Sequence, residues 1–286
     1  MSGNLPVAYR ILREGLALEI ALVESDRLLL HEETIPSSLS MLKDRIKRDG
    51  VLKTPVIVDR DSLVILDGMH RVKALRELGC RYTCACLVDY ADPEIKLDRW
   101  CRTVDQSLKL VGLNSQLKEL GITISEEDIG SASNEIILLL REGTYRATAP
   151  EKGIRASLEA VVELEFWLVS KGYVVTHETD RDANEKFSQG NIGAVIYPPI
   201  IEKNQVLDVA RSGQVLAYKS TRHVIPARPI GVNVSLSLLQ DPELNVSEVN
   251  SMLSESLHSK RLRRIPPGTL IGNRRYEEEL YVFEDD

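Results

Sequence analysis

The stretch VILDGMHRVKALRELGC, residues 64–80, joins a predicted strand to a predicted helix through a turn that contains a glycine. The apolar residues before Asp67 are typical of a buried strand, and Val72 and Leu75 follow it at helical spacing. Gly68 can adopt a positive φ and lets another group approach the backbone closely. A helix that starts here presents N–H groups and the positive end of its dipole, so the turn is a candidate anion site, and phosphate is the usual occupant.

Three side chains around this turn suit a nucleotide phosphate. Arg71 adds a charged fork that matches phosphate oxygens, and His70 can donate to a phosphate or transfer a proton. Asp67 can hold Mg²⁺ through water beside such a phosphate. The stretch is not a Walker loop, because G-x-x-x-x-G-K-[ST] is absent. The local pattern leaves a second interpretation open, in which Gly68 only makes a turn, Asp67 caps the helix and the other two side chains are solvated.

The segment up to about residue 104 alternates predicted strands and helices. Helices are expected over residues 37–50 and 70–79, and strands over 16–25, 54–59, 62–66 and 82–90. Ser37 or Ser38 can cap the start of the first helix, and Gly50 ends it.

The remainder of the chain divides into a helical part and a part rich in strands. Helices are expected over residues 107–121, 125–143 and 155–172, with a capped acidic start at Ser125, and strands and turns after Tyr173. We place a soft boundary near residues 105–110. It separates residues 1–107, a nucleotide-binding lobe, from 108–286, a helical segment with a mixed α/β substrate lobe.

Composition limits the function classes. The chain has 286 residues, 43% of them hydrophobic, which suits one large domain or two medium ones. The formal net charge of −7 argues against a general nucleic-acid binder. No signal peptide opens the chain and no apolar run is long enough to cross a bilayer, so we expect a cytoplasmic protein without membrane contact. The cysteines do not follow a C-x-x-C pattern, which favours reduced thiols over a zinc site: Cys80, Cys84, Cys86 and Cys101.

The order of several stretches resembles a known superfamily. LLLHEETIPSSL (28–39), DGVLKTPVIVD (49–59), the stretch at 64–80 and LVDY (87–90) follow one another at close spacing. This series resembles the ParB/sulfiredoxin superfamily and, within it, the free L-serine kinases. STRHVIPARP (220–229) is similar to a substrate-site segment of those kinases.

The resemblance implies an α+β enzyme of two lobes, a ParB/sulfiredoxin-like nucleotide lobe and a mixed α/β lobe, with an active-site cleft between them. It would phosphorylate free L-serine to O-phospho-L-serine, which in this family usually leads to cysteine synthesis. ADP is the implied phosphate donor rather than ATP, with Mg²⁺ as the metal. The expected partners are therefore the nucleotide and L-serine, and the oligomeric state stays open.

The resemblance also implies roles for individual residues. Glu32, in the His31–Glu32 pair, would be the general base that accepts the serine hydroxyl proton, although the adjacent Glu33 is not separable from it. Asp67, also the metal ligand, and His70 complete the catalytic set. The nucleotide would bind at Asp67, Gly68, Met69, His70 and Arg71, and serine at Thr221, Arg222, His223, Trp100 and Ser38. Without the resemblance, the two glutamates are an acidic loop before a helix, Trp100 is core packing and Ser38 is a helix cap.

One departure from the family pattern bears on the alternatives. The kinases usually have Asp-Gly-His-His-Arg, and this chain has Met69 at the first histidine. Sulfiredoxins need a reactive cysteine at this position, and Met69 has no thiol, which excludes sulfiredoxin activity. A ParB-like DNA-binding protein needs a basic recognition helix, and the only strongly basic stretch is Ser259–Arg264. A nucleotide-binding regulator without kinase activity stays open.

Overall fold

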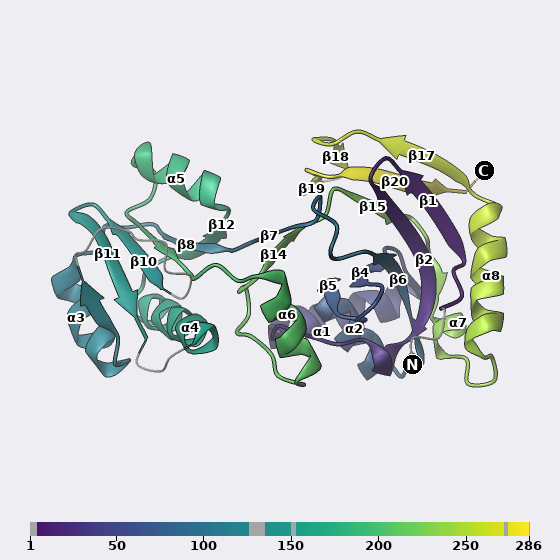
Figure 1. The fold of residues 1–286 in the computed structure, drawn as a ribbon, viewed down its shortest axis with the longest axis horizontal. Helices are drawn as coiled ribbons and strands as arrows, with labels where there is room; N and C mark the ends of the chain where they lie inside the picture. Colours follow the sequence, from purple (N-terminus) through teal and green to yellow (C-terminus); the bar gives the residue numbers. More distant parts are fainter. Residues whose placement is uncertain (1–4, 126–134, 150–152, 272–273, 286) are drawn as a thin grey trace. The chain divides into compact units, whose positions relative to one another are not determined.

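The computed structural model describes residues 5–125, 135–149, 153–271 and 274–285. The chain forms two compact units, each assembled from separate stretches (Figure 1). Unit 1 contains residues 1–96, 210–214 and 223–286, and unit 2 contains residues 97–209 and 215–222. The predicted division at residues 107/108 assigns residues 223–286 to the second lobe, whereas in the structure they pack with the N-terminal residues.

Unit 1 is built around a five-stranded sheet in the order β1-β2-β6-β4-β5. The strands are β1 (Tyr9–Arg13), β2 (Leu16–Glu24), β4 (Val56–Asp59), β5 (Ile65–Asp67) and β6 (Tyr82–Val88). β4 and β6 are parallel and the other neighbours are antiparallel. Every residue of β4 and β6 is buried, and apart from Asp59 and Thr83 these strands are continuous apolar runs rather than alternating ones.

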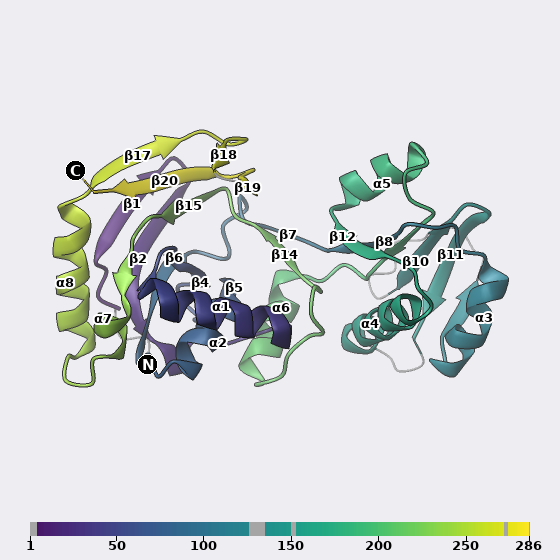
Figure 2. The same cartoon turned by 180° about the vertical axis from the view of Figure 1, so that it is seen from behind.

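Two helices of unit 1 pack against each other beside this sheet, α1 (Pro36–Asp49) and α2 (Met69–Glu77) (Figure 2). Val72 of α2 lies in the core with Val56, Val58 and Ile65 of the strands. The predicted cap of α1 is wrong: Ile35 occupies the N-cap position without a side-chain bond, and Pro36 starts the helix, because its fixed φ is already helical. Gly50, with φ 68°, ends α1 as predicted.

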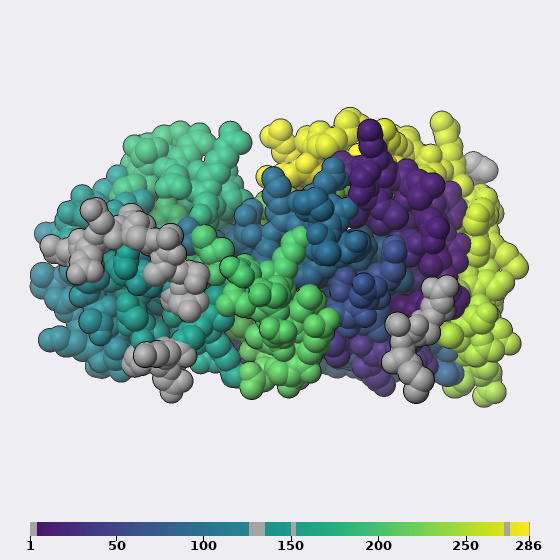
Figure 3. All heavy atoms as spheres, viewed as in Figure 1, coloured from purple at the N-terminus to yellow at the C-terminus, as the bar shows by residue number. Residues whose placement is uncertain are grey.

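The C-terminal part of unit 1 adds a second sheet and two helices to the unit. A small sheet contains β15 (Ala227–Ile230), β20 (Glu279–Glu284) and β17 (Arg261–Ile265), and the helices α7 (Leu236–Gln240) and α8 (Val246–His258) lie between β15 and β17 in the chain. The side chain of Asn250 on α8 bonds the backbone N–H and carbonyl of Leu22 on β2, at 2.7 and 2.9 Å. Figure 3 shows the yellow C-terminal residues beside the purple N-terminal ones on the surface of this unit. The shorter elements are η1 (Ser25–Arg27), β3 (Val51–Leu52), β16 (Val234–Ser235), β18 (Leu270–Ile271) and β19 (Arg274–Arg275).

Unit 2 contains an antiparallel six-stranded sheet in the order β12-β8-β13-β10-β11-β9. The strands are β8 (Cys101–Val104), β9 (Thr123–Ser125), β10 (Ile136–Leu140), β11 (Gly143–Thr148), β12 (Val175–Glu178) and β13 (Ala194–Tyr197). One apolar core lies between the sheet and the helices α3 (Leu110–Glu119) and α4 (Ile154–Ser170), and a smaller one lies under α5 (Asp180–Ser188). The chain passes between the units within β7 (Lys96–Asp98), α6 (Lys203–Arg211) and β14 (Arg222–Val224), and once more between residues 214 and 215.

The α+β class expected from the resemblance is confirmed. The helix predicted over residues 125–143 is wrong where the structure describes it, because Ile136–Leu140 form a strand whose residues alternate between buried and half-buried. The acidic part of that prediction, residues 126–134, lies outside the described residues. The helices α5, α6 and α8 were not predicted, since only strands and turns were expected after Tyr173.

Two expectations from composition can be compared with the structure. Across the described ranges, no helix is long and apolar enough to span a bilayer. All four cysteines are buried as thiols without a disulfide. Burial raises the pKa of Cys80 to about 11 and that of Cys86 to about 12, so both thiols are protonated and weakly nucleophilic at neutral pH.

Candidate active site

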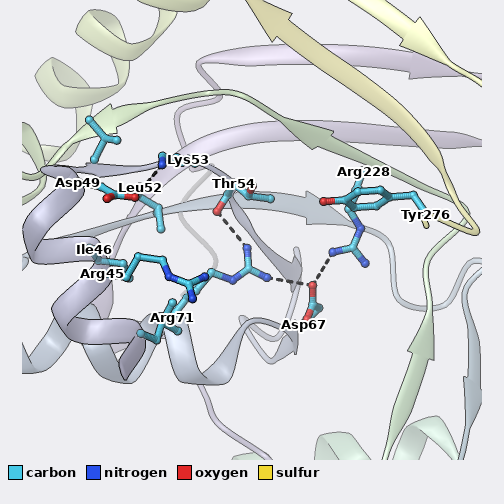
Figure 4. Close-up of a pocket in the computed structure, with 12 residues that line it drawn as sticks. Arg45, Ile46, Asp49, Leu52, Lys53, Thr54, Asp67, Arg71, Arg228 and Tyr276 are labelled. Carbon is cyan, nitrogen blue, oxygen red and sulfur yellow. Dashed lines mark hydrogen bonds and ion pairs between the residues drawn. The ribbon is translucent and has the colours of Figure 1, made fainter. Parts of the chain in front are cut away.

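The turn between β5 and α2 carries a cluster of opposite charges in unit 1. Oδ2 of Asp67 accepts a bond from Nη2 of Arg71 at 2.9 Å and one from Nη1 of Arg228 at 2.7 Å (Figure 4). Arg71 lies one helical turn after Asp67, whereas Arg228 comes from β15. Asp67 therefore holds two guanidinium groups side by side at the start of α2, where an anion would also meet the helix N–H groups.

Gly68 is required at this turn. It is the N-cap of α2 with φ 107°, a conformation that L side chains rarely adopt. A Cβ at this position would lie 2.6 Å from Cγ1 of Val56 and 2.9 Å from Nη2 of Arg71. The predicted close approach of another group to the backbone is thus made by Val56 and Arg71, and no side chain caps the helix.

The two residues after Gly68, Met69 and His70, make different structural contacts. Nε2 of His70 accepts the backbone N–H of Ile35 at 3.0 Å, which ties the first turn of α2 to the start of α1. Nε2 of His70 is therefore unprotonated in this bond. Met69 packs against the apolar core of unit 1. The side chain at this position thus makes an apolar contact, whereas the kinases that the sequence resembles have a histidine here. The backbone N–H of Met69 still lies at the start of the helix.

A pocket of about 320 Å³ lies against this turn within unit 1 (Figure 4). Leu42, Ile46 and Leu52 give it an apolar wall. Its charged lining consists of four cations and two carboxylates: Arg45, Lys53, Arg71, Arg228, Asp49 and Asp67. Tyr276 adds an aromatic ring, half-buried in the structure. An apolar wall next to an excess of cations suits a nucleotide, whose base is apolar and whose phosphates are anionic.

The segment before α1 runs beside β5. The N–H of Ile65 donates to the carbonyl of Leu29 at 3.0 Å, and Leu29 pairs with Val64 in a parallel bridge. Since the same segment reaches His70 through Ile35, Glu32 lies on a stretch that runs alongside the strand leading to Asp67. Glu32 is 7% exposed and Glu33 is exposed, so the two glutamates that the sequence could not separate differ in environment.

A cluster of two imidazole rings and one tyrosine ring contains His31, the residue before Glu32. His31 is fully buried, and burial lowers its pKa to about 4, so it is neutral at neutral pH. Its ring meets that of His223 edge-on at 5.4 Å between centroids. Nε2 of His223 lies 2.8 Å from the hydroxyl of Tyr90, which is itself buried. His223, predicted from the sequence as a substrate residue, is thus fixed in unit 1.

The other predicted serine-binding residues divide between the units. Ser38 is the third residue of α1 in unit 1 and half-buried. Thr221, Arg222 and Trp100 belong to unit 2. Thr221 is buried, Nη1 of Arg222 pairs with Asp98 at 3.1 Å, and the guanidinium of Arg222 lies 5.5 Å from the centre of the half-buried Trp100 ring.

Sequence reasoning missed Arg228 and Tyr90. Arg228 stands in STRHVIPARP, a stretch that the resemblance had already singled out, so its charge was a usable signal. Tyr90 ends the stretch LVDY, but nothing in that pattern predicts a bond to a histidine 133 residues later.

With the site described, comparison with known proteins gives the family. No family model matches the chain. A protein of Staphylothermus marinus named ATP-dependent L-serine kinase is 30% identical over 240 residues, which cover 78% of this chain and 92% of that protein. The chain belongs to the L-serine kinase family. The resemblance stated from the sequence is thereby confirmed.

Two further proteins are similar to the chain at lower identity. The ADP-dependent L-serine kinase SerK of Thermococcus kodakarensis is 23% identical over 78% of this chain and 93% of its own length. A ParB-like protein of Sulfolobus acidocaldarius is 26% identical over 71% of this chain and 88% of its own length. A solved structure of a free serine kinase, with a glutamate replaced by alanine and AMP bound, superposes with a TM-score of 0.68 and 21% identity, covering 78% of this chain and 94% of that one. This structural likeness extends the shared fold over both units.

Proposed function

We propose that this chain transfers a phosphoryl group from a nucleotide to the hydroxyl of free L-serine. The observation that carries the proposal is the pair of guanidinium groups on Asp67 at the start of α2, beside a pocket of nucleotide character, in a member of this family. In phosphoryl transfer, the protein contributes mainly positioning and electrostatic stabilisation, and a helix start with two arginines offers both.

The pocket lined by Leu42, Ile46 and Leu52 is the proposed donor site. The nucleoside would lie on this apolar wall, and its phosphates would reach Arg71, Arg228 and the N–H groups that follow Gly68. Arg71 is itself anchored, because Nη1 donates to the carbonyl oxygens of Thr54 and Pro55. An anchored guanidinium loses little further side-chain entropy when a phosphate binds.

Magnesium is proposed together with the nucleotide. Across the described part of the chain, no group of three or more His, Cys, Asp and Glu side chains is arranged to hold a metal ion. Mg²⁺ commonly binds through one or two carboxylates and the substrate phosphates, and Asp67 is the carboxylate available at this turn. Since Arg71 and Arg228 already occupy Oδ2 of Asp67, contact through a water molecule fits this site better than direct coordination. The ion would neutralise charge on the transferred group.

Glu32 is the proposed general base. A base in phosphoryl transfer accepts the proton of the attacking hydroxyl, and a carboxylate shielded from bulk water is better suited to this than a solvated one. The burial of Glu32 and the exposure of Glu33 support this assignment. Serine itself would be bound by Ser38, Thr221, Arg222, His223 and Trp100, of which Arg222 offers a charged fork for its carboxylate.

ADP and ATP both stay candidates for the donor. The resemblance implied ADP, and SerK of Thermococcus kodakarensis is named for it. The relative with the higher identity is named ATP-dependent, which supports ATP. The cytoplasm, where reduced thiols persist, is the proposed compartment.

The deciding experiment is a donor panel. Purified protein, L-serine and Mg²⁺ are mixed with ADP, ATP or CTP, and the products are identified by phosphorus NMR. O-phosphoserine with AMP identifies ADP as the donor, and O-phosphoserine with ADP identifies ATP. If the nucleotide binds but no donor yields phosphoserine, the proposal is wrong and the nucleotide-binding regulator replaces it, with Met69→His as the next variant to assay.

The DNA-binding alternative has less support. In β17 and the residue before it, three of the four cations of the basic stretch are paired with acids of the C-terminal strand region: Lys260 with Asp285, Arg263 with Glu284 and Arg264 with Glu279. A surface on which most cations are already paired offers little net positive charge to a phosphate backbone.

A further inference from the structure

Unit 2 contains a buried charge cluster centred on Arg102, to which no role has been assigned. Arg102 of β8 is 1% exposed. Its Nε donates to Oε2 of Glu165 on α4 at 3.0 Å. Its other nitrogens bind backbone carbonyls: Nη1 that of Trp100 and that of Lys219, each at 2.9 Å, and Nη2 that of Tyr218 at 3.1 Å. One guanidinium thus connects a helix, a strand and the segment at residues 218–219.

Glu165 is held in place from a second side. Nε2 of His177 on β12 lies 3.2 Å from Oε1 of Glu165. Burial alone would raise the pKa of Glu165, but the bonds from His177 and the charge of Arg102 hold that pKa below its usual value. Glu165 is therefore ionised at neutral pH, and the cluster is a paired charge network rather than a shared proton.

The segment held by Arg102 leads directly into predicted serine-binding residues. Lys219 has φ 57°, a left-handed conformation that costs a residue with a side chain free energy and persists only where the surroundings fix it. Its Nζ lies 4.7 Å from the centre of the Trp100 ring, on which Arg222 also lies. Thr221, between the two cations, is buried. The arrangement places two cations next to the indole ring of Trp100.

We propose that Arg102, Glu165 and His177 form a positioning cluster that holds Trp100 and residues 218–222 in the conformation that binds the carboxylate of L-serine. This rests on the proposed function for the identity of the ligand. Only a planar guanidinium fork can bind Glu165 and three carbonyls at once. A buried ion pair contributes little net stability compared with apolar residues of the same size, so its geometric effect on the neighbouring segment is its distinctive contribution.

Glu165→Gln tests the cluster, and Glu159→Gln on the same helix is the matched control. Glu159 also pairs with an arginine, Arg155, but both side chains are half exposed. For Glu165→Gln we expect the KM for serine to rise about tenfold or more, with kcat and the KM for the nucleotide within about threefold of the original. Glu159→Gln is expected to leave all three parameters unchanged. Glu165→Asp, which keeps the charge, is expected to give an intermediate KM for serine and also serves if the glutamine variant does not fold.

A fluorescence titration separates this inference from the proposed activity. Trp100 and Trp167 are the two tryptophans of the chain, so Trp167→Phe leaves Trp100 as a single reporter. L-serine should change its emission, and Glu165→Asp in that background should shift the midpoint to higher serine concentration. If serine binds but no donor supports phosphorylation, the proposed function fails and the positioning role survives. If both Glu165 variants lower only the melting temperature and leave serine binding unchanged well below it, the cluster is merely structural and the inference is overturned.

Discussion

Glu32 and Glu33 are adjacent carboxylates in different environments. Glu32 is buried on the segment beside β5, and Glu33 faces solvent. We expect Glu32→Gln to lower kcat about 10²- to 10⁴-fold, since a positioned base contributes on that order. Glu33→Gln, the matched control, should stay within about twofold. Initial rates of phosphoserine formation measure both. Equal losses in the two variants, or a fully active Glu32→Gln, would exclude Glu32 as the base.

His31 makes stability depend on pH. Its pKa is about 4 in the folded protein because of burial, against 6.5 as the ordinary value. Between these values the unfolded state binds more protons than the folded state, so the free energy of unfolding decreases as the pH falls from about 6.5 to about 4 and is unaffected by this group above 6.5. The loss amounts to roughly 3 kcal/mol when complete.

Urea unfolding at pH 7.5, 6, 5 and 4.5 measures this loss. The variant His31→Asn should be less stable at pH 7.5 but lose less stability on acidification than the original chain does. His258→Gln is the control, because His258 is exposed on α8, and it should retain the original pH dependence. An unchanged pH dependence in His31→Asn would contradict the assignment.

At the scale of elements, α2 is flanked by two glycines with positive φ that differ in their surroundings. A Cβ at Gly68 would lie 2.6 Å from Val56, whereas none of the neighbouring atoms comes within 4 Å of a Cβ at Gly79. We expect Gly79→Ala to lower the free energy of unfolding by about 1 kcal/mol, because of the positive φ alone. Gly68→Ala should lower it further and should also weaken nucleotide binding. Urea unfolding and nucleotide titration measure both effects. Equal stability losses with unchanged nucleotide affinity would show that the close packing at Gly68 is unimportant.

Elements with local signals could be predicted from the sequence, and those defined by tertiary contacts could not. The helices α1 and α2 followed from apolar spacing and glycine stops. The run IILLL at Ile136–Leu140 has no period of its own, so only its pairing with β11 and β13 makes it a strand. For α8 a signal existed and was overlooked, since Asn245 and Glu248 form a capping box.

In the candidate site, too, local pairs could be predicted from the sequence, whereas contacts between distant segments could not. Asp67 and Arg71 are four residues apart on either side of the start of α2, so their proximity is visible in the sequence. Arg228 joins them from 161 residues away, and the resemblance supplied only the stretch in which it lies. Arg102 stands in an ordinary strand, and its bonding partners come from three segments of unit 2: the residue before its own strand, α4 and residues 218–219.

At the scale of the whole molecule, the two units differ in how the chain builds them. Residues 97–222 contain all of unit 2, interrupted only by residues 210–214 of unit 1, whereas unit 1 needs both ends of the chain. We expect a fragment of residues 97–222 to unfold cooperatively in urea. A fragment of residues 1–107 should not, because it lacks α8 and β20 and leaves the Leu22 backbone without Asn250. Far-UV circular dichroism during urea titration tests both, and a cooperative transition of the 1–107 fragment would contradict this view.

The bonds between Asn250 and Leu22 have a consequence for synthesis on the ribosome. β2 is among the first strands to emerge, yet the helix that covers its backbone follows more than 200 residues later. At about 5–20 residues per second, the translation of that interval takes roughly 10–40 s. During this delay the central unit can fold on the nascent chain, while the N-terminal sheet remains incomplete and a potential client for chaperones until the last helix leaves the exit tunnel.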